Sequence, residues 1–366
     1  MGSGVNLPAL RGHNDALVLH LLRGAGPVGL GRGDLADRTG LTPQAVGKIT
    51  ARLRDEGLVA DAGREASTGG KPRTLLRLVR EARHAVGLHL DRDEATAVRV
   101  DLAGRAVARW RGPLDFGAGP EAVLEEAVRA VARVRGDRPL LGVGVAAPGP
   151  LDWRSGVLGR VTGYPQWEGF PLREALEGRL GIPVRVDKDT NAGVAAATLP
   201  GVGSEGADSE GAVAYVHVGT GLGAGLRLLG GGEVYRGRRS AAGEFGHQVL
   251  RLDGPPCRCG GYGCAEVLCL DAVAAGRPQE AARIVGEAAA NLVALLDVDR
   301  VLLGGRVVAA APEMFVEGVR AVLAARSVAL AGGEGEGEGV RVELARVGVA
   351  EGAAELVLAP LFGRGG

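Results

Sequence analysis

The sequence predicts an α/β protein in which a small winged helix-turn-helix domain precedes a larger body. Two patterns lead to this prediction. Residues 1–80 contain short amphipathic helical segments followed by two apolar β-type runs, whereas strand-like and helix-like segments alternate from residue 82 onward. The 366 residues also suffice for two or more domains at about 150 residues each. We expect the domains to comprise residues 1–80 and residues 81–366.

Composition and hydropathy exclude several classes of protein. The chain is 46% hydrophobic and 23% charged, which is ordinary for a globular protein. It contains no run of about 18 apolar residues that would span a membrane, and its first residues lack the apolar stretch of a secretory signal. We therefore expect a cytoplasmic protein without a membrane partner.

Charge is distributed unevenly along the chain. Residues 1–80 hold twelve Lys and Arg against seven Asp and Glu, a net charge of +5, so the remainder carries −5. Neutralisation of phosphates by cationic side chains drives nucleic-acid affinity. A basic module on an acidic body therefore favours a polyanionic partner for that module.

The first domain reads as three helical segments. Residues 14–23 and 32–40 carry two of them, and the third begins at Thr42, with Pro43 at its first helical position, and stops at Gly57. Two β-type runs around the polar motif TGGKPR follow and predict the wing.

The third helix and the wing carry the side chains that we expect to contact DNA. Thr50 on the helix is an additional candidate for a DNA contact. Small polar and cationic side chains on such a helix can reach base edges or phosphates in a major groove. The alternative is a small helical protein-interaction domain with a solvated basic loop. The expected contact residues are Thr42, Gln44, Lys48 and Arg52 on the helix, and Lys71 and Arg73 on the wing.

Four cysteines lie within thirteen residues, at Cys257, Cys259, Cys264 and Cys269. Three glycines lie between Cys259 and Cys264, so the backbone can wrap tightly enough for the thiolates of the first three cysteines to converge. In a chain without an export signal, this spacing favours a metal site over disulfides. The alternative is a set of reduced thiols in a glycine-rich loop.

Three motifs of the body carry a family resemblance. VDKDTNA begins at Val186, GEFGH at Gly243 and CRCGGYGC at Cys257. In this order and spacing they resemble the ROK family (repressor, open reading frame, kinase). The resemblance implies an actin-like, hexokinase-type fold with two α/β lobes around a cleft.

The resemblance also implies the organisation of the body. Lobe one would span about residues 81–190 plus a C-terminal helix at 347–362, and lobe two would span residues 191–346. A basic winged helix in front is similar to the repressor branch of the family. That branch implies a homodimer, with a tetramer as the alternative.

The resemblance implies a zinc site and a sugar site that share one histidine. His247 would complete a structural Cys3His zinc site with Cys257, Cys259 and Cys264, whereas Cys269 is not part of the family motif and is expected to be a buried thiol. The sugar-binding residues that the family implies are Asp189, Asn191, Glu244, His247 and Glu266.

The phosphate loops of the kinases are only partly present. Where the first loop of the family reads Asp-x-Gly-Gly-Thr, this chain has Asp91, Arg92, Asp93, Glu94 and Ala95. Two acidic residues in place of glycines would remove the close backbone approach and bring negative charge to the polyphosphate. The second loop, Gly219–Gly223, and the turn Gly304–Gly305 are intact. We expect no phosphotransfer, with Asp189 as a vestigial general base.

A second departure concerns the sugar. The family has an Asn before its Pro-x-Trp, where this chain has Gly163. One hydrogen bond to a sugar hydroxyl would be lost, which makes the free energy of sugar binding less favourable by roughly 1 kcal/mol.

These expectations together describe a sugar-responsive transcriptional regulator, a repressor that binds a palindromic operator with a kinase-like body. Two alternatives stay open. One is a ligand-independent regulator with a degenerate pocket, which fits Gly163 and the acidic first loop. The other is an active sugar kinase, glucokinase-like, which fits Asp189 and the intact second loop.

Overall fold

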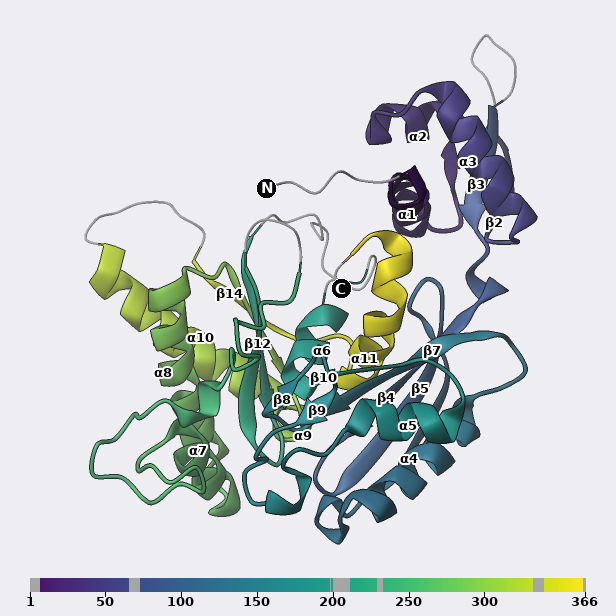
Figure 1. The fold of residues 1–366 in the computed structure, drawn as a ribbon. Helices are drawn as coiled ribbons and strands as arrows, with labels where there is room; N and C mark the ends of the chain where they lie inside the picture. Colours follow the sequence, from purple (N-terminus) through teal and green to yellow (C-terminus); the bar gives the residue numbers. More distant parts are fainter. Residues whose placement is uncertain are drawn as a thin grey trace.

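The computed structural model describes residues 7–65, 73–197, 199, 211–228, 233–331 and 339–364. It shows a small head joined to a body of two α/β lobes (Figure 1). Lys71, one of the expected DNA contacts, lies outside the described residues. Within the described part of the chain, no helix combines the length and apolar character needed to cross a bilayer.

The head contains three helices and a three-stranded antiparallel sheet of order β1-β3-β2. Thr42 caps the third helix by accepting a hydrogen bond from the Ala45 amide, 3.2 Å away, and Pro43 occupies the first turn. The elements are α1 (Leu7–Ala25), β1 (Leu30–Gly31), α2 (Arg32–Thr39), α3 (Pro43–Asp55), β2 (Val59–Glu65) and β3 (Arg73–Leu78).

Lobe one is built on a mixed five-stranded sheet of order β10-β7-β4-β5-β6. Its parallel strands β4, β7 and β10 end at one edge, where the cleft lies. The elements are η1 (Arg80–Ala82), β4 (His84–Leu90), β5 (Glu94–Asp101), β6 (Ala106–Pro113), η2 (Phe116–Ala118), α4 (Pro120–Val134), β7 (Leu140–Ala147), β8 (Leu151–Asp152), β9 (Val157–Leu158), η3 (Pro165–Trp167), α5 (Leu172–Leu180) and β10 (Val184–Lys188).

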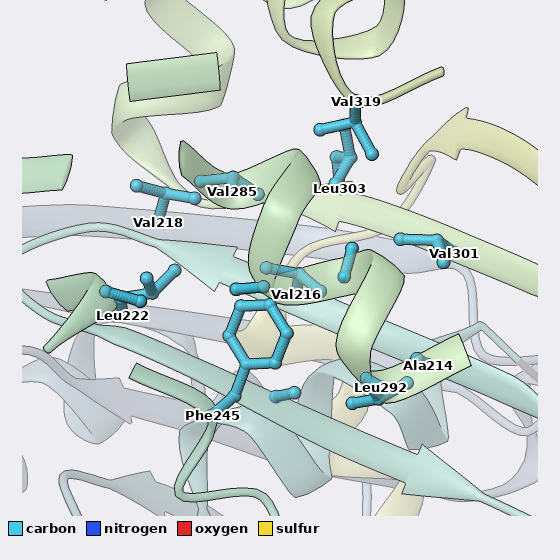
Figure 2. Packing of buried hydrophobic residues seen from close by; sticks show 14 of the residues in the cluster. Ala214, Val216, Val218, Leu222, Phe245, Val285, Leu292, Val301, Leu303 and Val319 are labelled. Atoms are coloured by element: carbon cyan, nitrogen blue, oxygen red, sulfur yellow. The ribbon is translucent and has the colours of Figure 1, made fainter. Parts of the chain in front are cut away.

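Lobe two is built on a four-stranded sheet of order β12-β11-β13-β14. Phe245 projects into the apolar core between this sheet and the helices that cover it (Figure 2). The elements are β11 (Val213–Val218), β12 (Leu222–Arg227), η4 (Phe245–His247), α7 (Ala265–Ala274), α8 (Pro278–Leu296), β13 (Arg300–Gly304), α9 (Arg306–Ala310), α10 (Pro312–Ala331) and β14 (Arg341–Leu344).

Helices α6 (Asp189–Ala196) and α11 (Val349–Leu358) lie between the lobe sheets and touch each other (Figure 1). A side chain on Gly352 would come within 1.7 Å of the Ala192 carbonyl oxygen, and one on Gly144 within 1.7 Å of the Ala353 carbonyl oxygen. Glycine is therefore required where α11 crosses α6 and where it lies on β7. The remaining element, η5 (Ala359–Phe362), follows α11.

A buried ion pair fixes the head to the body. Arg23 at the end of α1 donates through Nη1 and Nη2 to the two carboxylate oxygens of Glu355 on α11, each over 2.8 Å. The side chains are 1% and 3% exposed, and the guanidinium lies 4.3 Å from the ring centroid of Phe362. Leu19 and Leu22 of α1 share the surrounding apolar core with α11. The head and lobe one therefore have a common core.

We predict that Arg23→Met destabilises the chain by about 3–5 kcal/mol, because Glu355 would remain buried without its counter-charge. The double variant Arg23→Met with Glu355→Leu should recover most of this loss, since well-packed apolar residues can replace a buried pair. Urea unfolding followed by circular dichroism measures both.

The matched control is Arg277→Met, which removes the exposed pair with Glu280 and should leave stability nearly unchanged. A single variant at Arg23 that unfolds at the wild-type urea concentration would contradict the role assigned to the buried pair.

Candidate functional site

A small pocket of about 80 Å3 lies between the lobes, where residues from both sheets and the loop before η4 meet. Four of the five expected sugar contacts line it together, although they come from three separate segments of the chain. They are Asp189, Glu244, His247 and Glu266. These residues offer carboxylate and imidazole groups, which can hydrogen-bond the hydroxyls of a sugar.

Asp189 is held at the junction of β10 and α6. It is the first residue of α6, and its Oδ1 accepts a hydrogen bond from the Thr190 amide over 2.6 Å. The other carboxylate oxygen can therefore accept from a ligand. A position at the end of a parallel strand is where α/β folds place ligand-binding groups.

Asn191 requires a correction. Its side chain is 1% exposed and donates through Nδ2 to Asp187 Oδ1 over 2.7 Å, and the residue does not line the pocket. On α6 it lies two residues beyond Asp189, so the two side chains point in different directions. Asn191 thus braces α6 against β10, outside the lining of the pocket.

The loop that carries Glu244 and His247 is anchored by the residue between them. Phe245 is 3% exposed and packs into the core of lobe two (Figure 2). Gly243 has φ +88°, and a Cβ there would lie 1.9 Å from the Ala224 carbonyl oxygen. Both features fix the loop on β12, so its polar side chains face the pocket.

Glu266 closes the same pocket from the first turn of α7. Its Oε2 accepts a hydrogen bond from the Leu222 amide over 2.8 Å, and the residue is 9% exposed. Cys264 is the N-cap of this helix. The position of Glu266 therefore depends on how Cys264 is held.

The cluster of His247 with Cys257, Cys259 and Cys264 can hold a metal ion. One ligand atom from each lies within 4.8 Å of the others. Cys259 Sγ and Cys264 Sγ are 3.7 Å apart, and Cys257 Sγ lies 3.7 Å from His247 Nδ1. A tetrahedral site with Zn–S bonds of about 2.3 Å requires sulfur atoms about 3.8 Å apart. The donor set and its spacing therefore fit zinc.

Cys269 lies outside this cluster. Burial, with the nearby Glu266 carboxylate, raises the pKa of its thiol to about 12. The residue is fully buried and is not part of the cluster that could hold a metal ion.

Sequence reasoning missed a lysine in the pocket. Lys188 is buried and donates to Glu244 Oε1 over 3.2 Å and to the Ala242 carbonyl oxygen. It is one of three lysines in the chain and directly precedes Asp189, which was a signal that it belonged to the site. Its ammonium group occupies one oxygen of Glu244. Thr162, Arg92 and His217, which also line the pocket, were missed as well.

The segment that corresponds to the first phosphate loop bridges the two lobes. Thr220 Oγ1 donates to Asp91 Oδ1 over 2.6 Å, and Arg92 Nη1 donates to the Thr220 carbonyl oxygen over 2.7 Å. Burial alone would raise the pKa of Asp91, but the hydrogen bond from Thr220 and the nearby His89 outweigh it, so the pKa is below its usual value. Arg92 lies beside Gly221, whose added Cβ would be 3.4 Å from Arg92 Nη2.

The expected excess of negative charge at this loop is wrong. Asp93 accepts two hydrogen bonds from Arg306, of 2.8 and 2.9 Å, and Glu94 pairs with Arg111 over 2.6 Å. Each acidic side chain therefore has an arginine partner elsewhere in the fold. The loop differs from a phosphate loop through these pairs and through Arg92 beside Gly221, although a pocket of about 680 Å3 stays open next to Asp91 and Arg306.

The exposed face of α3 is narrower than expected. Gln44 and Lys48 are exposed, together with Ala51 one turn on. Arg52 is half-buried and pairs with Asp15 of α1. Thr50 is fully buried, and its hydroxyl donates to the Val46 carbonyl oxygen over 2.8 Å. Thr50 is therefore excluded as a DNA contact, because the helix turns it into the core of the head.

Thr42 and Arg73, two further expected DNA contacts, are both exposed. Thr42 is exposed but its hydroxyl oxygen serves as the cap of α3. Arg73 is exposed at the start of β3, next to the segment that contains Lys71.

The sequence profile of the ROK family matches residues 87–277. The chain belongs to the ROK family. This confirms the resemblance found in the three motifs. Relatives in this family include both repressors and kinases.

Two relatives in the family are a regulator and a kinase. NagC of Escherichia coli K12, a DNA-binding transcriptional dual regulator, is 32% identical over 73% of this chain. The matched segment covers 64% of NagC, so the chain spans less than two thirds of that relative. The ROK hexokinase of Thermus thermophilus is 32% identical, with a TM-score of 0.56, over 74% of this chain and 96% of its own.

A crystal structure of a ROK transcriptional regulator, a homologue of the E. coli MLC protein, resembles the chain over almost its full length. The TM-score is 0.74, with 21% identity, over 96% of this chain and 97% of the other. At this identity the likeness concerns the fold. It confirms the predicted fold class, a winged head on a two-lobed ROK body.

Proposed function

We propose that this ROK protein is a sugar-responsive transcriptional repressor. The observation that carries the proposal is the continuous connection between pocket and head. Asp189 begins α6, α6 packs on α11, and Glu355 of α11 binds Arg23 of the head. A sugar that shifts Asp189 therefore acts on the element that holds the DNA-binding helix.

The connection is short and stiff enough to transmit a displacement. The crossing of α6 and α11 has no side chain between the two backbones at Gly352. Closely packed interiors move as units because they contain few voids to absorb a shift. Binding alters operator affinity only if the sugar favours one arrangement of the head over another.

The proposal includes a homodimer in the cytoplasm. A two-fold dimer presents two α3 helices, so its operator is palindromic, with half-sites separated by one helical turn or a multiple of it. Two relatives are named as transcriptional regulators, NagC and a homologue of the MLC protein. These names support the proposal that this chain is a regulator.

We predict that selection from a random duplex pool by the purified chain enriches a palindrome. Lys48→Ala should weaken binding to that palindrome about tenfold and lower its salt dependence, because one phosphate or base contact is lost. Fluorescence anisotropy at two salt concentrations measures this.

The control for the DNA experiment is Lys188→Ala, which removes a lysine of the body and should leave affinity for DNA without sugar unchanged. Failure to enrich any palindrome would contradict the proposed regulator.

The kinase alternative rests on Asp189 and on the intact loop Gly219–Gly223. Catalysis of phosphoryl transfer requires backbone amides close to the nucleotide phosphates. Arg92 instead fills the space beside Gly221, and the Asp93–Arg306 pair joins the loop to α9. We propose that these contacts replace the nucleotide and that the chain has lost phosphotransfer.

We predict that a sugar that binds the pocket does so without turnover. Calorimetry over a panel of hexoses should detect binding that Asp189→Asn weakens about tenfold or more, since a carboxylate hydrogen bond to a hydroxyl is lost. Release of ADP in the presence of ATP and the same hexose should stay at background. Turnover that disappears in Asp189→Asn would instead establish the kinase.

We also propose that the metal is structural zinc. It would hold His247 and Cys264, and so would join the loop that carries Glu244 to the start of α7, which carries Glu266. In a closed Cys3His site zinc contributes folding energy, not reactivity.

We predict one zinc ion per chain in the purified protein, measured by mass spectrometry of the metal. Cys264→Ala should lose the metal, unfold at a lower temperature and lose sugar binding, because α7 is no longer fixed. Cys269→Ala is the matched control and should retain the metal. Equal zinc loss in the two variants would contradict the assignment.

A further inference from the structure

A second and larger pocket lies where the head meets the body. Its volume is about 650 Å3, within the range of small-molecule sites. The walls come from the end of α1 and from β3 in the head, and from the β5–β6 turn and the segment before α11 in the body. The pocket therefore exists only while head and body keep this arrangement.

The lining of this pocket is strongly cationic. Of six arginines, three have a carboxylate partner: Arg23 pairs with Glu355, Arg109 with Glu351 and Arg80 with Glu81. Among the residues that the structure describes, no carboxylate pairs with the guanidinium groups of Arg77, Arg105 or Arg346. These three arginines come from three different elements of two domains. Arginine side chains that line one pocket without counter-charges are suited to bind phosphate bidentately.

Two buried polar atoms of the lining lack partners in the described part of the chain. They are Arg23 Nε, which can only donate, and Glu351 Oε2, which accepts when ionised. Both residues are about 5% exposed. A ligand that offers hydroxyl groups beside a phosphate could satisfy both, because a hydroxyl both donates and accepts.

We propose that this pocket binds a small phosphorylated polyol, with the phosphate on Arg77, Arg105 and Arg346. The lining contains no aromatic side chain on which a nucleobase could stack, which favours a compact ester over a nucleotide. The site is distinct from the sugar pocket between the lobes. Because its walls belong to both domains, a bound ligand stabilises the present position of the head, and any effect on DNA affinity rests on the proposed function.

Binding is tested on the full chain with glycerol 3-phosphate as the probe and with glycerol and chloride as controls at equal ionic strength. Calorimetry should detect glycerol 3-phosphate, with inorganic phosphate binding more weakly and glycerol not at all. The double variant Arg77→Gln with Arg346→Gln should weaken binding at least about tenfold, because two charge-assisted contacts are lost. Both side chains are partly exposed, so the variant is expected to fold.

Two control variants identify the site. Arg283→Gln removes an exposed arginine of α8 and should leave binding unchanged. Lys48→Gln tests whether the probe instead occupies the DNA face as a mimic of the phosphate backbone. The proposal is overturned if binding is lost in Lys48→Gln and kept in the double variant, or if chloride stabilises the chain as much as the probe does. These results are independent of whether the chain binds an operator.

Discussion

The position of the head on the body depends on the buried ion pair between Arg23 and Glu355. Two charges taken out of water are stable only when their geometry and hydrogen bonds are nearly ideal. Here both oxygens of the carboxylate meet both terminal nitrogens of the guanidinium, and Phe362 covers the guanidinium. An apolar interface alone would tolerate sliding of the head. The bidentate pair allows one register of α1 on α11.

Helix α11 connects this pair to the rest of the molecule. Glu355 faces the head, Glu351 one turn earlier binds Arg109 of β6, and Gly352 between them lies against α6. One helix thus contacts the head, the outer strand of lobe one and the helix that begins with Asp189. The kinases and the regulators of the ROK family share the two-lobed body. In this chain the C-terminal helix of that body also anchors the head.

Local sequence patterns predicted the parts of the molecule whose determinants lie close together in the chain. The capped start of α3 and the thiol cluster with its glycines each depend on fewer than about ten neighbouring residues, where backbone preferences act directly. The sequence did not show that Asn191 would be buried, with its amide donating to Asp187. Thr50 was misjudged because it lies at the edge of the helical face that enters the core.

The ion pairs on which the proposed function rests could not be predicted from the sequence, because they join residues far apart in the chain. Arg23 and Glu355 are 332 positions apart, and Asp93 and Arg306 are 213 apart. In a chain with many arginines, no pattern indicates which of them meets which carboxylate. The acidic residues of the first loop therefore seemed to repel phosphate. In the fold Asp93 and Glu94 are each paired with an arginine.

The central claim is that occupancy of the sugar pocket reaches the DNA-binding head through α6, α11 and the Arg23–Glu355 pair. The most direct measurement is operator affinity with and without a bound sugar, in the wild-type chain and in the double variant Arg23→Met with Glu355→Leu. The account predicts that sugar changes wild-type affinity at least about fivefold, within the usual range of allosteric coupling. In the double variant the sugar should still bind while this ratio falls close to one. A double variant that keeps the full wild-type ratio would contradict the account.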